Sequence, residues 1–160
     1  DYSAIATYGS GSFTVAFDWN GNYKGNVLAV AHYPASPSSF PDYFLITANT
    51  LNLPYQGETY YYDSNGNQIN GTYPMDANNI KYCKIVINAD KSVFSYANGT
   101  LNQTYLEKTI RHEVGHVFLL KHPPSAYYPA SVMHQGMPSN QISATVTSDD
   151  RENIKQKWGQ

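Results

Sequence analysis

The chain has 160 residues, a length that suits one domain, and its net charge of −2 comes from 10 basic and 12 acidic side chains. Only 14% of its residues are charged, against about 25% in an average soluble protein, which excludes a coiled coil, an acidic disordered tail and a strongly basic nucleic-acid binder. No apolar run approaches the ~20 residues that span a bilayer. Four of the five histidines lie between His112 and His134.

Hydrophobic patterns predict the elements of the N-terminal part. Phe13–Asp18 alternates apolar and polar residues and predicts a strand. Apolar residues then recur at helical spacing and predict a short helix over about 23–33, although Gly25 weakens a helix. Three prolines between positions 34 and 41 enforce a loop. Tyr43–Ala48 predicts a central strand.

A hairpin is predicted next. Glu58–Tyr62 and Gln68–Tyr73 flank Asn65-Gly66, a pair that supplies the positive φ angles of a tight turn. The acidic and amide residues of this turn look like half of a calcium loop, but the glycine is misplaced and Pro74 stands at position twelve. The pattern favours a turn over a calcium site. Ca²⁺ is a possible second ion, but no clear local motif supports its binding.

A strand followed by a long helix is predicted after the hairpin. Lys84–Asn88 is apolar enough for a strand, and Cys83 at its start is expected to be a buried small hydrophobe. Thr104 and Glu107 have the spacing of a capping box, so the helix is expected to begin there. Pro123 and the proline after it end it.

The C-terminal part is predicted to be irregular over 124–147 and then helical over about Ser148–Trp158, with two aspartates in the positive first turn. We find no internal repeat and no linker, so 1–160 is expected to be one domain. Few lysines and glutamates with many tyrosines, asparagines and serines fit a secreted, extracellular protein, and Asp1 is expected to be a processed or engineered start.

Three histidines have the spacing of metal ligands. His112 and His116 are four residues apart within the predicted helix, so both rings lie on one face and can reach one ion. Glu113 is one residue round the helix, where it can act as a general base on a metal-bound water. His122 lies six residues after His116, and three histidine ligands leave a fourth position for water, as in catalytic zinc sites.

The sequence resembles a family at this point. HEVGHVFLLKH at 112–122 is similar to the long zinc motif of the metzincin metallopeptidases, H-E-x-x-H-x-x-G-x-x-H. Ser131–Met133 is similar to that family's Met-turn, and Asp149–Gly159 looks like the closing helix of its matrixin branch.

The resemblance implies an α+β, zincin-like fold: a twisted mixed sheet, a zinc-binding active-site helix, a Met-turn and a small C-terminal helical subdomain. Residues 1–160 would form one catalytic domain, divided into about 1–122 and 123–160. An edge strand would bind an extended protein or peptide substrate, and Lys84–Asn88 is the expected edge. Residues 136–138 are possible lining of the substrate pocket.

Two positions depart from the family pattern. The family glycine is Leu119 here; a left-handed leucine costs ~1–2 kcal/mol, so we expect the helix to continue toward Leu120 and the chain to turn near Lys121. Some metzincins carry a tyrosine where this chain has Gln135, which excludes a phenol there. His134 is expected to face solvent.

The resulting hypothesis is a zinc-dependent endopeptidase in which His112, His116 and His122 hold one Zn²⁺ and Glu113 is the general base. Met133 would be structural. We expect a monomer with no nucleic-acid partner and no membrane span. Two alternatives stay open: a different enzyme class in which Glu152 is the third ligand, and a secreted zinc-stabilised binding module or adhesin whose peptidase cleft is degraded.

Overall fold

The computed structural model describes residues 2–8, 11–17, 26–32, 43–49, 55–69, 79–88, 90–124, 131–135 and 144–158, the first four of these ranges by their backbone. Across these ranges, no helix is both long and apolar enough to cross a membrane.

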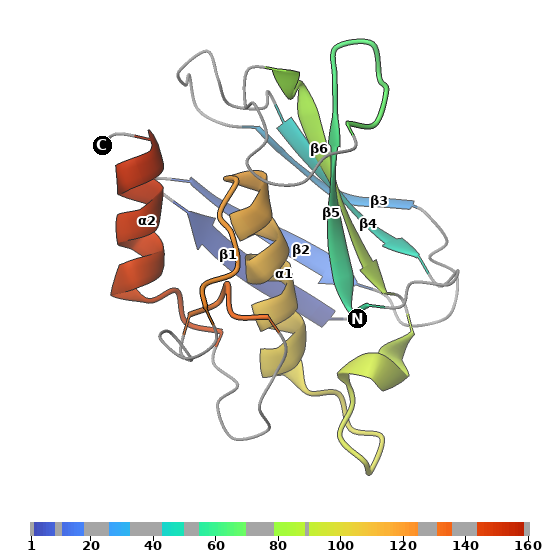
Figure 1. Ribbon diagram of the computed structural model, residues 1–160. Coiled ribbons are helices and arrows are strands. Elements are labelled where there is room, and N and C mark those ends of the chain that lie inside the picture. The colour runs from blue at the N-terminus through green and yellow to red at the C-terminus, as the bar shows by residue number, and fades with distance from the viewer. Residues whose placement is uncertain are drawn as a thin grey trace.

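The described chain forms a mixed α/β fold with two sheets and two α-helices (Figure 1). The elements in chain order are β1 (Tyr2–Tyr8), β2 (Gly11–Phe17), β3 (Asn26–His32), β4 (Tyr43–Asn49), β5 (Gly57–Tyr62), β6 (Tyr82–Asn88), the short 3-10 helix η2 (Lys91–Phe94), α1 (Gln103–Val117) and α2 (Ser148–Trp158). Strands β1 and β2 pair with each other, and the other four form one sheet in the order β3-β4-β6-β5.

The register of the four-stranded sheet corrects one prediction. β4 pairs antiparallel with β3 and parallel with β6, so the predicted central strand Tyr43–Ala48 is confirmed. β6 pairs with β4 on one side and antiparallel with β5 on the other. Lys84–Asn88 is therefore an interior strand and the prediction that it forms the edge is wrong, because both of its backbone edges are already hydrogen-bonded. The edge on this side is β5.

The helix predicted over 23–33 is also wrong, because this stretch contains strand β3. Its backbone pairs with β4 from Asn26 to His32, with an irregularity between Val27 and Ala29. A short apolar run has no periodicity that separates a helix from a buried strand. Pairing with a neighbouring strand, which the local pattern does not contain, decides the outcome. The strand predicted at Phe13–Asp18 is confirmed as β2, and β1 was not predicted.

The turn after β5 is confirmed. Gly66 has a φ of 81°, and its N–H donates to the Asp63 carbonyl at 3.1 Å. The Asp63 carboxylate accepts hydrogen bonds from the backbone N–H groups of Asn65 and Asn67, which lower its pKa. Gln68 forms one bridge with Tyr62, and the rest of the predicted second strand lies outside the described residues.

The core lies between the sheet and α1. Alternate residues of β6 point toward the helix, so Cys83 is fully buried, as expected. They pack with one face of α1 and with residues before and after it. The described core consists of Tyr61, Ile80, Cys83, Ile85, Ile87, Phe94, Leu106, Ile110, Val114, Val117, Phe118, Leu119, Leu120, Val132 and Met133.

The N-terminus of α1 differs from the prediction. Asn102 is the N-cap, and its side chain accepts a hydrogen bond from the Tyr105 N–H at 3.1 Å. Thr104 is an exposed residue inside the first turn, so it does not start a capping box. The asparagine cap is sufficient because its oxygen satisfies one of the four N–H groups that a helix start leaves open.

Candidate metal centre

The C-terminal half of α1 and the turn after it carry the three candidate ligands. His112 and His116 lie one helical turn apart on α1, and His122 follows the helix. Leu119 N–H donates to the His116 carbonyl at 2.8 Å, and Leu120 N–H donates to the Gly115 carbonyl at 3.1 Å. These two bonds form a Schellman motif, which ends the helix and reverses the chain.

Leu119 takes the left-handed conformation that this motif requires. Its φ is 58°, and α1 ends at Val117 with Phe118 as C-cap. The prediction that the helix continues toward Leu120 and turns near Lys121 is therefore wrong. The side chain of Leu119 is only 3% exposed. Its burial with the core offsets the ~1–2 kcal/mol that the left-handed backbone costs.

The turn brings the three imidazoles to one point. Nε2 of His122 lies 3.0 Å from Nε2 of His112 and 3.0 Å from Nε2 of His116. The Nε2 atoms of His112 and His116 are 3.1 Å apart. Three ligand nitrogens of a tetrahedral site with Zn–N bonds of ~2.0–2.1 Å are separated by roughly 3.3–3.4 Å. The three histidines therefore lie close enough to bind one metal ion.

The hydrogen bonds at the opposite side of two rings define their tautomers. Nδ1 of His112 lies 2.8 Å from the Val132 carbonyl oxygen, and Nδ1 of His116 lies 2.9 Å from the Leu120 carbonyl oxygen. A carbonyl only accepts, so each Nδ1 carries the proton and each neutral ring directs the lone pair of Nε2 into the cluster. Two such lone pairs cannot hydrogen-bond with each other, but both can bind a cation.

Burial keeps these rings neutral. It lowers the pKa of His112 to about 3 and the pKa of His116 to about 4, and it lowers the pKa of His122. Neutral imidazole is the form that binds a metal. Few protons therefore have to leave the cluster when an ion enters near neutral pH.

The segment Ser131–Gln135, which we call the Met-turn segment, packs against α1 at His112 and Gly115. Its Val132 carbonyl orients His112, and Met133 packs against α1 at Gly115. A Cβ added to Gly115 would lie 2.1 Å from the Met133 sulfur. A side chain at this helix position would therefore displace the methionine, which explains why the second variable position of H-E-x-x-H is glycine here.

Asp150 connects the Met-turn segment to α2. Its side chain is 1% exposed, and its carboxylate accepts hydrogen bonds from the Ser131 hydroxyl, from the Val132 N–H at 3.2 Å and from the Thr147 N–H at 2.9 Å. The Thr147 hydroxyl lies 3.2 Å from the Asp150 N–H. Thr147 and Asp150 thus cap α2 reciprocally, and the same carboxylate holds the Met-turn segment.

Glu113 lies beneath the edge strand β5. Its side chain is 5% exposed, and its Oε2 accepts a hydrogen bond of 2.7 Å from the Thr59 hydroxyl. In the metal-free protein burial raises the pKa of Glu113 to about 7, the Thr59 hydrogen bond lowers it, and the charge of Glu58 raises it. A cation bound at the three histidines would favour the ionised form.

Two further residues near the cluster were placed differently by sequence reasoning or missed by it. His134 is half-buried, not solvent-facing as expected, and its Nδ1 is buried without a hydrogen-bond partner. Lys108 is 7% exposed and donates to the His134 carbonyl at 3.0 Å, and its pKa is lowered by burial. Lys108 and Thr59 lie outside the H-E-x-x-H motif, so only the strand-to-helix register could have revealed them.

Glu152, the alternative third ligand, is not part of the histidine cluster. Glu152 is exposed on α2, with its carboxylate 4.0 Å from Lys155 Nζ. Residues 136–138, the expected pocket lining, lie outside the described residues.

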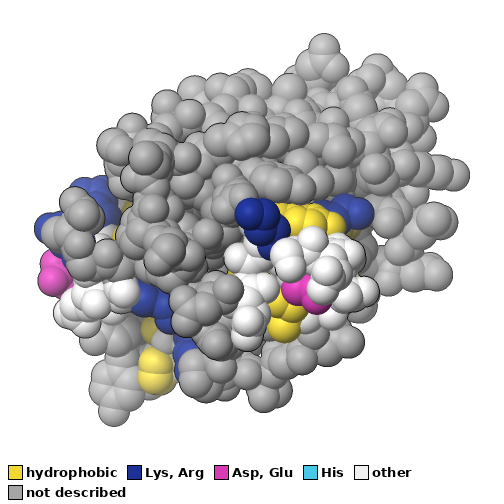
Figure 2. Space-filling model, turned by 90° about the horizontal axis from the view of Figure 1, so that it is seen from above, with side chains coloured by type: hydrophobic (Ala, Val, Ile, Leu, Met, Phe, Trp, Pro, Cys, Tyr) yellow, Lys and Arg dark blue, Asp and Glu magenta, His cyan; other side chains and the backbone are white. Residues whose placement is uncertain are grey.

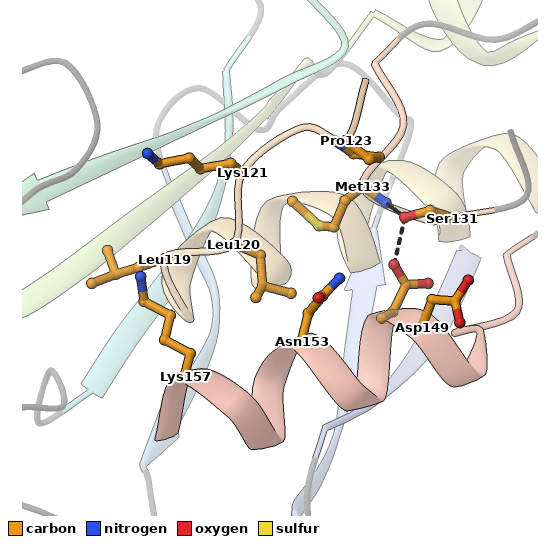
Figure 3. Close-up of a pocket in the computed structure, with 10 residues that line it drawn as sticks. Leu119, Leu120, Lys121, Pro123, Ser131, Met133, Asp149, Asn153 and Lys157 are labelled. Atoms are coloured by element: carbon orange, nitrogen blue, oxygen red, sulfur yellow. Dashed lines mark hydrogen bonds between the residues drawn. The ribbon is translucent and has the colours of Figure 1, made fainter. Parts of the chain in front are cut away.

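A cavity of about 280 Å³ lies between the turn after α1, the Met-turn segment and α2. Figure 3 shows Leu120 and Met133 on one side of it and Asn153 and Lys157 of α2 on the other. The three histidines and Glu113 are not among the described residues that line it. On the face seen in Figure 2, the described basic, acidic and hydrophobic side chains are interspersed.

Searches of protein-family models, curated proteins and solved structures found no match to this chain.

Proposed function

We propose that this chain is a zinc-dependent endopeptidase of the metzincin type. The observation that carries the proposal is the convergence of three Nε2 atoms within 3.0–3.1 Å of one another beside a buried glutamate. Three imidazole ligands leave one position for water or substrate, which is typical of catalytic zinc sites. Imidazole and this geometry favour zinc over calcium or magnesium, which prefer oxygen ligands.

Each residue would have a separate role in hydrolysis. His112, His116 and His122 would hold the ion, which when bound polarises the scissile carbonyl and lowers the pKa of its water to near 7. Glu113 would accept the proton of the attacking water and deliver it to the leaving amine.

Strand β5 is the place where an extended substrate would lie. It forms the edge of the sheet and contacts α1 beside Glu113. Among the described strands, none pairs with its outer side before the bridge at Tyr62. A peptide could therefore add to it as a further strand and present a peptide bond to Glu113 and the ion. From the sequence we expected the substrate along Lys84–Asn88, which lies in β6; we propose β5 instead, because β5 is the edge strand.

The test is hydrolysis of a generic unfolded protein such as casein. The purified protein should cleave it, a chelator should abolish cleavage, and added Zn²⁺ should restore it. Glu113→Ala should retain about one zinc per chain and lose cleavage, because the ligands remain and the base is gone. Unimpaired cleavage by Glu113→Ala would contradict the mechanism.

Matched variants separate the alternatives. Glu152→Ala should retain zinc and activity, whereas His122→Ala should lose zinc; the reverse result would favour the class in which Glu152 is the third ligand. Stoichiometric zinc with no hydrolysis of any unfolded substrate would favour a zinc-stabilised binding module. The glycine-like backbone of Leu119 weakens the argument that this position degrades the cleft.

A further inference from the structure

Strand β5 turns its smallest side chains toward Glu113. Residues at alternate positions of a strand share a face, and Gly57, Thr59 and Tyr61 all contact α1. A Cβ added to Gly57 would lie 3.0 Å from Cγ of Glu113. The phenol of Tyr61 donates to the His116 carbonyl at 2.7 Å. The strand therefore packs directly against the helix around Glu113.

The hydroxyl of Thr59 has one proton and two acceptors within reach, both on Glu113. Its oxygen lies 2.7 Å from Oε2 and 3.0 Å from the backbone carbonyl oxygen. The carboxylate is the closer and, when ionised, the stronger acceptor, so the proton is directed to Oε2. Among the described residues, none donates a hydrogen bond to the second carboxylate oxygen, Oε1.

We propose that Thr59 is a positioning residue for Glu113. Its hydroxyl holds Oε2 against β5 and thereby selects one rotamer of the carboxylate, which leaves Oε1 to accept the proton of the attacking water. The inference rests on the proposed peptidase function. Because a misplacement of about 1 Å at a reacting group can cost ~100-fold in rate, we expect loss of this hydrogen bond to lower activity ~10–100-fold.

The first test compares Thr59→Val with Thr59→Ser. Valine keeps the shape of threonine and removes the hydroxyl, so kcat should fall ~10–100-fold with little change in KM and with zinc still at about one per chain. Serine restores the hydroxyl, so Thr59→Ser should recover most of the lost kcat. A Thr59→Val protein with the kcat of the wild type would overturn the proposal.

Two control variants exclude a general loosening of the structure. Thr104→Val makes the same change at an exposed position of α1 and should leave kcat unchanged. Tyr61→Phe removes a different hydrogen bond between β5 and α1. If Tyr61→Phe lowered kcat as much as Thr59→Val and serine failed to rescue, docking of β5, and not the position of the carboxylate, would explain the loss.

The contact between Thr59 and Glu113 can also be tested without an activity assay, by measuring the unfolding stability of metal-free variants. In a double-mutant cycle, the destabilisations caused by Thr59→Val and Glu113→Ala should be less than additive, since both remove the same bond. Strict additivity would overturn the contact. If the wild-type protein hydrolyses nothing, the proposed function fails, while this cycle still shows whether Thr59 holds Glu113.

Discussion

At the scale of single residues, the site depends on one position with an unusual backbone conformation, Leu119, and on one position without space for a side chain, Gly115. Leu119 has a side chain where the backbone suits glycine, and burial of that side chain in the core offsets the strain. Gly115 has no side chain because Met133 occupies the space beside it. Gly115 adjoins His116, and Leu119 lies in the turn between His116 and His122, so we expect their effects on stability and on metal binding to be linked.

Comparing Leu119→Gly with Leu119→Ala isolates the backbone strain. Both variants lose the buried side chain, but only glycine relieves the positive φ of 58°. Leu119→Gly should therefore be about 1 kcal/mol more stable than Leu119→Ala, the reverse of their order in a helix interior. Urea unfolding of the two proteins measures the difference. If alanine proved the more stable, the left-handed conformation would be wrong.

Gly115→Ala should destabilise the protein by about 1–3 kcal/mol, because the new Cβ overlaps Met133, which is only 2% exposed. Displacement of Met133 should also move the neighbouring Val132 carbonyl away from His112 and weaken zinc binding. Unfolding and zinc titrations check both effects. Shortening the methionine in the same chain, as Gly115→Ala with Met133→Ala, should cost less than the sum of the single changes.

At the scale of elements, α1 positions more residues of the candidate site than any other described element. It begins at an asparagine cap, ends in a Schellman motif, and between them presents His112, Glu113 and His116. The cap is remote from the ligands, so it tests the contribution of the helix itself to stability.

Asn102→Ala should destabilise the protein by about 1 kcal/mol, because the Tyr105 N–H loses its side-chain acceptor and keeps only the Asn102 backbone carbonyl, 3.1 Å away. Thr104→Ala, at the position expected to begin a capping box, should stay within about 0.5 kcal/mol of the wild type. Chemical denaturation distinguishes the two. A larger effect at Thr104 than at Asn102 would show that the helix begins later.

The same elements show what could be predicted from the sequence. The spacing of His112, His116 and His122 was enough to predict that these residues lie together, because two lie on one helical face and the chain reverses before the third. Local pattern failed where tertiary pairing decides. β3 is a strand because it pairs with β4, and β5 is the edge because β6 pairs on both sides. The contact of Thr59 with Glu113 joins residues 54 positions apart, which no local motif encodes.

At the scale of the whole molecule, segments distant in sequence support one cluster. β5 covers Glu113, α1 carries two candidate metal ligands, the turn after it carries the third candidate, and the Met-turn segment orients His112. With a single cysteine in the chain, no internal disulfide can hold these segments together. A bound ion joining α1 to the following turn would therefore add stability to the native state.

Metal removal should lower the melting temperature, because an ion that binds only the folded state stabilises it. With free zinc at ~1,000 times Kd the stabilisation is about 4 kcal/mol. Melting curves at increasing zinc concentration should show the temperature rising with the logarithm of concentration. His134→Ala should keep this dependence, since His134 is not part of the cluster, and His116→Ala should lose it. A zinc-independent melting temperature in the wild-type protein would contradict a metal centre.

Asp150 has a consequence for the order in which the protein can be made. The carboxylate that holds Val132 and Ser131 belongs to α2 and comes 38 positions after His112 in the sequence. During synthesis the three histidines leave the ribosome before α2 does, so a nascent chain exposes them while their support is still missing. The hydrogen bonds from Ser131 and Val132 to Asp150 can form only after this part of α2 has emerged. Metal loading should accordingly be a late event in the life of the chain.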